Sequence, residues 1–254
     1  MYSVDIVLNM SKAGFDESAY NRSLFLEGLY DSRQICTNSY QFIRNGNQIR
    51  IPVTCPEKDS LDDRNATDYA KKWRFALESQ LGTPIEFVHT GVEAAYEGYE
   101  IPENSSFYIL HYRGFSPLVC GDTHQEIPLY KIPYTYTALK NYKDINVWQW
   151  DYETFYDLWY GINGYEKRAR KEMEDVNSNL SKQGRDICQH IEAATGVPTF
   201  YYLLNYRDWG RKKDLARKCP ITGNDWLIEG STFNDFIAFK CDESRLVSGL
   251  SSSR

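Results

Sequence analysis

In the first half of the chain, hydrophobic residues recur in some segments at every second position, as in strands, and in others at every third or fourth position, as in helices. Short apolar or alternating runs bounded by turn residues predict strands. These predicted strands cover residues 4–9, 49–56, 85–90 and 107–114. Between them, apolar residues at helical spacing predict helices over residues 17–30 and 66–81, the second closed by Gly82 and Pro84. Strands interleaved with helices predict a mixed α/β domain over residues 1–140.

A helical pattern dominates the next part, residues 141–198. One apolar stripe recurs at steps of three, four or seven residues. Its members are Ala169, Met173, Val176, Leu180, Ile187 and Ile191. Gly184 interrupts the stripe, which predicts a break or kink there. The stripe packs either on its own domain or on the same helix of a second copy, so a homodimer stays open.

The last part, residues 199–254, begins with the predicted strand 199–206 and the basic segment RKKDLARK. The predicted fold class is therefore α+β. Its three predicted domains are residues 1–140, 141–198 and 199–254.

Charge and composition narrow the possible partners. The chain has 254 residues, 42% of them hydrophobic, and a net charge of −6. An acidic protein is a poor candidate for dedicated nucleic-acid binding, which needs a basic surface, and RKKDLARK is the one candidate patch. An apolar run of the roughly 18 residues needed to cross a membrane is missing, and the N-terminus does not resemble a secretory signal. We expect a cytoplasmic protein with no membrane partner.

The residues with catalytic chemistry do not form a known motif. Nucleotide-binding glycine patterns, the G-x-S-x-G elbow and H-E-x-x-H are all missing from the sequence. Cys120 and His124 lie four residues apart, a pairing that is more often incidental than catalytic. Six cysteines are scattered too thinly for a disulfide framework. The sequence predicts a protein without enzymatic activity or cofactor.

The segment WQWDYETFYDLWY, residues 148–160, combines carboxylates with tyrosine and tryptophan. Large aromatic side chains dominate binding energy at protein interfaces. The same pattern suits an amphipathic helix that packs into a core. The candidate partner-binding residues are Asp151, Tyr152, Glu153, Tyr156, Asp157 and Tyr160.

Several C-terminal elements together resemble a family of bacterial proteins. These elements are YYLL…WGR (201–211), CP..G.DWL (219–227) and FKCD..RLVS (239–248), supported by IEAATGVP (191–198) and SPLVCGD…IPLYKIP (116–133). Together they resemble the DUF2310 family, zinc-ribbon-containing proteins with a suggested role in nucleic-acid binding. The resemblance implies a C-x-x-C pair at each of two knuckles, which would supply four thiolates to a structural zinc ion.

This chain departs from that family pattern at both knuckles. Cys219 and Cys241 are present, but Thr222 and Ser244 occupy the second positions. Neutral hydroxyls are poor substitutes for thiolates on zinc, so we expect a degenerate ribbon without metal. Other ligands (Asp225, Asp242, His89, His111, His124 or His190) and a Cys219–Cys241 disulfide are the alternatives. We expect apolar burial to replace the ion, through Trp226, Ile228, Phe233, Phe236, Ile237 and Phe239. The ribbon would then be a β-hairpin docked on the rest of the chain.

Two functions fit these features. Some proteins that resemble this family are similar to immunity proteins, which protect a bacterium from a toxin of its type VI secretion system. An acidic, aromatic-rich protein suits the basic cleft of a nuclease toxin, which it would block sterically. The alternative is a nucleic-acid-associated protein whose zinc-ribbon-like tail and RKKDLARK segment contact phosphates.

Overall fold

The computed structural model describes residues 1–11, 16–161, 164–206, 210–232 and 235–251, and their contacts form two compact units. The first unit combines Met1–Pro102 with Ile127–Lys143, and the second combines Glu103–Glu126 with Asp144–Arg254. This grouping differs from the three consecutive domains predicted from the sequence, because each unit takes in segments that are distant along the chain. The α+β fold class is confirmed.

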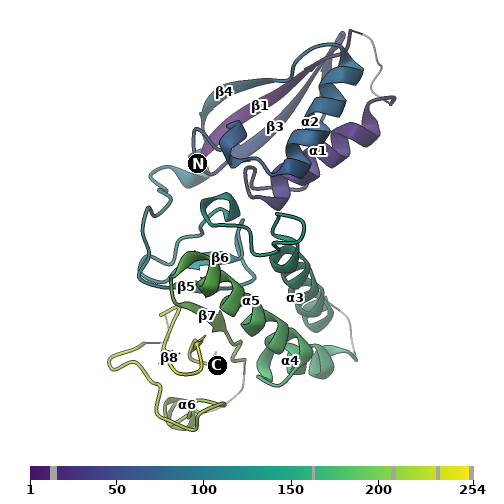
Figure 1. Ribbon diagram of the computed structural model, residues 1–254. Helices are drawn as coiled ribbons and strands as arrows, with labels where there is room; N and C mark the ends of the chain where they lie inside the picture. Colours follow the sequence, from purple (N-terminus) through teal and green to yellow (C-terminus); the bar gives the residue numbers. More distant parts are fainter. Residues whose placement is uncertain (12–15, 162–163, 207–209, 233–234, 252–254) are drawn as a thin grey trace. The chain divides into compact units, whose positions relative to one another are not determined.

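The first unit is an antiparallel sheet with two helices on one face (Figure 1). Its elements are β1 (Tyr2–Asn9), α1 (Ala19–Asp31), β2 (Ile43–Asn45), β3 (Gln48–Cys55), α2 (Asp68–Leu81) and β4 (Glu86–Val92), with 3-10 turns at Asp63–Asn65, Ala94–Tyr96 and Leu129–Lys131. The strand order β2-β3-β1-β4, with antiparallel neighbours throughout, is that of the βαββαβ or split βαβ motif. The three strands and two helices predicted for residues 1–90 are all present.

The core of the first unit lies between one face of the sheet and the two helices, because buried and less buried residues alternate along the strands. Ile6 and Leu8 of β1 and Ile51 of β3 are buried with Phe25 of α1 and Leu77 of α2. Every second residue of a strand points to the same face, so these side chains meet the two helices. The ends of α2 are specified locally, since the Thr67 side chain accepts a hydrogen bond from the Ala70 N–H and Gly82 adopts the left-handed conformation at the C-cap.

The second unit contains a five-stranded sheet with order β6-β5-β7-β9-β8. Its elements are β5 (Tyr108–Leu110), β6 (Leu118–Cys120), α3 (Lys143–Gly161), α4 (Glu166–Glu174), α5 (Asn179–Thr195), β7 (Thr199–Tyr202), α6 (Arg211–Leu215), β8 (Phe239–Cys241) and β9 (Leu246–Ser248). The predicted C-terminal hairpin is β8–β9, and β9 pairs in parallel with β7. The hairpin therefore forms one edge of the sheet. It is joined to β7 by backbone hydrogen bonds, whereas the sequence predicted only that it packs on the rest of the chain.

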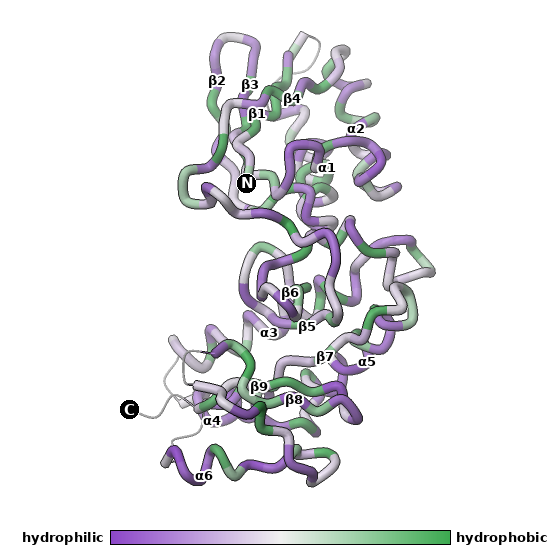
Figure 2. The backbone as a smooth tube through the Cα atoms, turned by 90° about the vertical axis from the view of Figure 1, so that its left-hand side faces the viewer, coloured by the Kyte–Doolittle hydropathy of each residue, from purple (hydrophilic) through white to green (hydrophobic). Residues whose placement is uncertain are grey.

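Both faces of this sheet are covered. Tyr201 of β7 packs against Trp148 of α3 on one face, with ring centroids 6.0 Å apart. The neighbouring residue Phe200 points to the other face, where it clusters with Ile109, Ile237 and partly buried aromatic residues. Hydrophobic green segments mark β9 in Figure 2, whereas α6 begins in hydrophilic purple. Consecutive residues of β6 and β9 are buried because side chains cover both faces of the sheet.

The prediction of a break at Gly184 is wrong. Gly184 lies in the middle of the continuous helix α5, and the chain breaks before it, where the Ser178 side chain caps the start of α5. A Cβ atom at position 184 would lie 2.3 Å from Tyr201 Cε2 and 2.8 Å from Trp148 Nε1. Glycine is therefore needed for the close approach of two buried rings and not for flexibility.

Gly184→Ala is expected to destabilise the protein by about 1–3 kcal/mol, the cost of overpacking a dense core. Gly161, near the end of α3, is the matched control, because a Cβ there meets nothing within 4 Å. Gly161→Ala should be neutral or slightly stabilising. Chemical denaturation of both variants tests this. Equal stability of Gly184→Ala and wild type would show that the rings move aside without cost.

The apolar stripe of residues 169–191 belongs to the core of the second unit. All six of its predicted members are buried, and α5 packs on β7 and β5. These side chains are engaged within one chain, so they do not offer a surface to a second copy. In the described part of the chain, no helix is long and apolar enough to traverse a lipid bilayer.

Candidate functional site

The surface of α3 presents acidic and aromatic side chains together. Trp150, Glu153, Asp157 and Tyr160 are exposed at positions i, i+3, i+7 and i+10 of the helix, so they follow one face. We call these four residues the acid–aromatic stripe. Trp150 is 73% exposed and Tyr160 is 81% exposed. The two rings flank a pair of carboxylates, and each ring keeps apolar area in contact with water.

Aromatic contacts extend the stripe across neighbouring elements. Tyr156 stacks on Tyr160 with ring centroids 6.3 Å apart, and the Arg113 guanidinium donates a hydrogen bond of 2.7 Å to the Tyr156 hydroxyl. Trp159 contacts Tyr206, the last described residue before position 210, at 4.6 Å. These contacts hold the side chains of Tyr156, Trp159 and Tyr160 in place. A preordered surface loses less conformational entropy on binding.

The predicted partner-binding residues divide into two groups. Asp151, Glu153, Asp157 and Tyr160 are exposed, and Tyr156 is half-buried. Tyr152, in contrast, is 1% exposed and stacks on Tyr112 with ring centroids 4.3 Å apart. Burial strongly raises the pKa of Tyr152. Tyr152 is a core residue and does not belong to the surface.

Sequence reasoning missed Trp150 and Arg113. Trp150 could have been found, because it lies three residues before Glu153 on the same helical face. Arg113 could not, because it follows β5 and meets α3 only through the tertiary fold. The guanidinium carbon of Arg113 lies 5.3 Å from the centre of the Tyr156 ring.

The four predicted knuckle positions come together at the turn of the β8–β9 hairpin. The Cys219 sulfur lies 3.2 Å from the Ser244 hydroxyl, and the Thr222 hydroxyl lies 3.8 Å from the Cys241 sulfur. We call these four side chains the thiol–hydroxyl cluster. Two tight turns build it. The Gly223 N–H donates to the Cys219 carbonyl, and Arg245, with φ of 51°, closes the turn after Ser244.

Hydrogen bonds favour the thiolate form of Cys219. Burial opposes its ionisation, but hydrogen bonds from the Ser244 and Thr222 side chains and from the backbone N–H groups of Thr222 and Ile221 outweigh it. Together they lower the pKa of Cys219 to about 7. All six cysteines of the chain are free, so the alternative of a Cys219–Cys241 disulfide is not the state of this structure.

The donors of the thiol–hydroxyl cluster do not fit a structural zinc ion. Such a site needs four ligands of the thiolate or imidazole type, and two of the four positions are neutral hydroxyls. Asp225 and Asp242 pair instead with Lys218 and Lys240, at 2.5 Å and 2.7 Å. Within the described residues, no three histidine, cysteine, aspartate or glutamate side chains group in a way that could hold a metal ion.

The histidines proposed as alternative zinc ligands are placed elsewhere. His89 lies in β4 of the first unit, and His190 lies 3.7 Å from Asp144. His111 is enclosed by the rings of Tyr112, Tyr202 and Phe236. Burial and the nearby Arg113 lower the pKa of His111 to about 3, so it is neutral at physiological pH.

Packing around Arg217 joins the C-terminal segment to the sheet. The Arg217 guanidinium carbon lies 4.9 Å from the Trp226 ring centre and 4.2 Å from the Phe239 ring centre. Arg217 also donates to the Ser248 hydroxyl and the Gly249 carbonyl, both at 3.1 Å, and the Trp226 indole donates to the Arg217 carbonyl. An arginine between two rings adds cation–π attraction to the apolar contact.

The six apolar residues expected to replace the ion behave differently. Trp226, Ile237 and Phe239 are buried, and Phe236 is partly buried. Ile228 is 39% exposed, so its expected contribution to the core is wrong. Phe233 lies outside the described residues.

Cys120 and His124 lie in one turn but do not form a catalytic pair. The His124 N–H donates to the Cys120 carbonyl, and the His124 ring contacts Phe236 at 5.1 Å. Burial raises the pKa of the Cys120 thiol, and hydrogen bonds from the Ser105 and Thr123 side chains more than reverse this, so the net shift is downward. The thiol is bound by hydroxyls and backbone N–H groups, and His124 is not among its partners.

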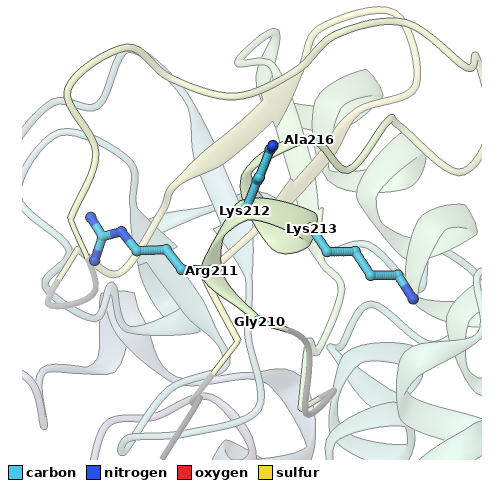
Figure 3. Close-up of a pocket in the computed structure, with 5 residues that line it drawn as sticks. All are labelled: Gly210, Arg211, Lys212, Lys213 and Ala216. Atoms are coloured by element: carbon cyan, nitrogen blue, oxygen red, sulfur yellow. The ribbon is translucent and has the colours of Figure 1, made fainter.

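The first part of the basic segment forms the short helix α6. A shallow pocket at this helix is lined by Gly210, Arg211, Lys212, Lys213 and Ala216. Figure 3 shows the Arg211 and Lys213 side chains pointing in opposite directions. Cationic groups that diverge do not chelate one phosphate, so the pocket lacks the convergent donors of an anion site.

Comparisons with known proteins match two parts of the chain. Residues 100–204 match a domain of unknown function, DUF2310, and residues 210–253 match a second domain of unknown function, DUF8594. An uncharacterized protein of Haemophilus influenzae is 34% identical over 208 residues, which cover 78% of this chain and 76% of that protein. The chain belongs to the DUF2310 family.

A second uncharacterized Haemophilus influenzae protein resembles this DUF2310 member. It is 36% identical over 148 residues, which cover 57% of this chain and 70% of that protein. No solved structure matches. The acid–aromatic stripe lies within the DUF2310 match, and the thiol–hydroxyl cluster lies within the DUF8594 match.

Proposed function

We propose that this DUF2310 protein is a non-enzymatic immunity protein that binds and blocks a secreted bacterial toxin. The acid–aromatic stripe is the observation that carries this proposal. Aromatic rings in this position supply contact area at low entropy cost, and the carboxylates supply charge complementary to a basic partner. We further propose a degenerate zinc ribbon at the C-terminus that acts as a scaffold and does not bind zinc.

The partner class follows from the charge of the stripe. After Lys143, α3 contains no basic residue, whereas Asp151, Glu153 and Asp157 are all exposed. A nuclease holds phosphates in a basic cleft, so a nuclease effector of a type VI secretion system is the proposed toxin. Insertion of the stripe into that cleft would exclude the nucleic acid sterically. This mechanism places the protein in the cytoplasm, where such a toxin acts.

Co-expression tests the proposal directly. A candidate toxin encoded next to this gene is expressed in a susceptible bacterium with and without the protein. We expect survival and a stable complex when both are present. Growth arrest despite full expression of the protein, together with no co-purification, would contradict the proposal.

The double variant Trp150→Ala/Tyr160→Ala is expected to weaken the complex at least 100-fold. Loss of a hot-spot aromatic residue costs about 2 kcal/mol or more, and this variant removes two. Phe75→Ala is the matched control, because Phe75 is 73% exposed on α2 of the first unit and lies outside the stripe. Calorimetric titration of the purified toxin measures both affinities. If the double variant bound the toxin no more weakly than Phe75→Ala, the interface would lie outside the acid–aromatic stripe.

The alternative function, association with nucleic acid, depends on the cations of α6. The exposed Arg211, Lys212 and Lys213 favour it, and their divergent side chains and the acidic net charge oppose it. A salt titration separates the two functions. Nucleic-acid affinity falls steeply with salt in proportion to the phosphates neutralised. Salt-sensitive binding to bare DNA or RNA, without any toxin complex, would favour the alternative.

A further inference from the structure

Each sulfur atom of the thiol–hydroxyl cluster lies next to a hydroxyl group from the opposite turn. The Ser244 hydroxyl lies 3.2 Å from the Cys219 sulfur. The Thr222 hydroxyl lies 3.8 Å from the Cys241 sulfur. Cys219 and Cys241 are both buried and neither forms a disulfide. The chain thus holds two free sulfur ligands in a shielded position, on turns fixed by backbone hydrogen bonds.

We propose that the thiol–hydroxyl cluster binds one copper(I) ion between the sulfur atoms of Cys219 and Cys241. The ligand is a soft, monovalent cation with a filled d shell. Thiolates select copper(I) over harder ions, because soft ligands prefer soft metals. Binding replaces the protons that the two thiols still hold by one Cu⁺ and releases those protons to solvent, so no oxidant or reductant is consumed.

The number of ligands decides against the common divalent ions. Zinc in structural sites takes four strong ligands, and magnesium and calcium take six or more oxygen ligands. The cluster offers two sulfurs, and the nearest carboxylates, Asp225 and Asp242, are engaged by Lys218 and Lys240. Copper(I) is satisfied by two thiolates in a linear arrangement, so the same donor set that fails for zinc is sufficient for copper(I).

The hydroxyls have a role in this site although they are weak ligands. Bound copper(I) leaves the pair of thiolates with a net negative charge. The Ser244 hydroxyl lies 3.2 Å from the Cys219 sulfur and the Thr222 hydroxyl 3.8 Å from the Cys241 sulfur, so each thiolate would have a hydroxyl donor in place before the ion arrives. Partners that hydrogen-bond to metal ligands orient them and tune the affinity.

Competition with a copper(I) chelator tests the proposal on the full-length, reduced protein without oxygen. Bicinchoninate forms a coloured copper(I) complex, and we expect the wild type to remove one copper(I) per chain from it. Cys219→Ser and Cys241→Ser should each lower the affinity by more than the ~10–100-fold typical of losing an outer partner of a metal ligand. Cys36→Ser, which removes a half-exposed thiol of the first unit, is the matched control and should retain the copper.

A second variant and a second measurement guard against misfolding. Ser244→Ala retains both sulfurs, and it should still bind one copper(I), with an affinity lower by at most ~100-fold. X-ray absorption at the copper edge should show two sulfur neighbours. The proposal is overturned if the wild type takes no copper(I) from the chelator, or if a folded Cys219→Ser/Cys241→Ser variant takes it undiminished. These outcomes do not depend on toxin binding.

Discussion

The variant Thr222→Cys/Ser244→Cys is expected to bind one zinc ion per chain and to gain stability from it. In the native cluster the four positions already meet, with sulfur and hydroxyl 3.2 Å apart at one side and 3.8 Å apart at the other. Replacing both hydroxyls by thiols supplies the four thiolates of a structural zinc site without a new backbone conformation. Structural zinc contributes apparent binding free energies of about 10–16 kcal/mol in small zinc-finger peptides.

Part of that binding energy should appear as stability. A ligand present at 1,000 times its Kd stabilises the folded state by about 4 kcal/mol. Elemental analysis should give one zinc per chain, and the cobalt-substituted variant should show the absorption of tetrahedral thiolate coordination. Thermal unfolding with and without a chelator measures the gain in stability.

The control variant for this prediction exchanges the threonine and the serine, so both positions keep a hydroxyl group. Thr222→Ser/Ser244→Thr should behave like the wild type, with no stoichiometric zinc and no loss of stability when a chelator is added. Zinc bound equally well by the wild type and by Thr222→Cys/Ser244→Cys would contradict our account of the native cluster.

Phe239→Ala is expected to lower the free energy of unfolding by about 3–5 kcal/mol, the usual cost of truncating a buried phenylalanine. Phe239 begins β8, is fully buried, and packs on Trp226 with ring centroids 5.2 Å apart. Its ring also lies against the Arg217 guanidinium. The truncation therefore removes apolar burial and a cation–π contact at the same position.

Ile228→Ala is the matched control for Phe239→Ala. It truncates a large apolar residue of the same C-terminal segment, but one that is 39% exposed, so its cost should stay below about 1 kcal/mol. Denaturant titration of both variants checks the comparison. If the two truncations cost the same, burial around Arg217 would not be what holds the segment.

Most elements of the fold could be predicted because their signals are local. The alternation of β1 and β3, the capping Thr67 and the terminal Gly82 of α2 each act within a few residues of one another. Local hydrogen bonds and the periodic burial of one face determine such elements wherever the chain places them. The α+β class followed from their order.

Gly184 shows why the same reasoning failed inside the second unit. A glycine in a helical stripe has two physical explanations, a bend in the backbone or a close approach of another group. The choice depends on Tyr201 and Trp148, which come from β7 and α3. Tyr152 is a similar case, because its partner Tyr112 comes from a segment 40 residues earlier in the sequence.

The sequence by itself determined the type of most helices and strands, the acidic and aromatic character of α3, and the replacement of two thiols by hydroxyls. Only the tertiary structure decided which α3 side chains are exposed, that the hairpin β8–β9 extends the sheet through β7, and that Arg217 holds the C-terminal segment. It also brought Cys219 and Cys241 into one cluster. Composition and periodicity are properties of neighbouring residues, whereas burial and ligand geometry arise between residues that meet only after folding.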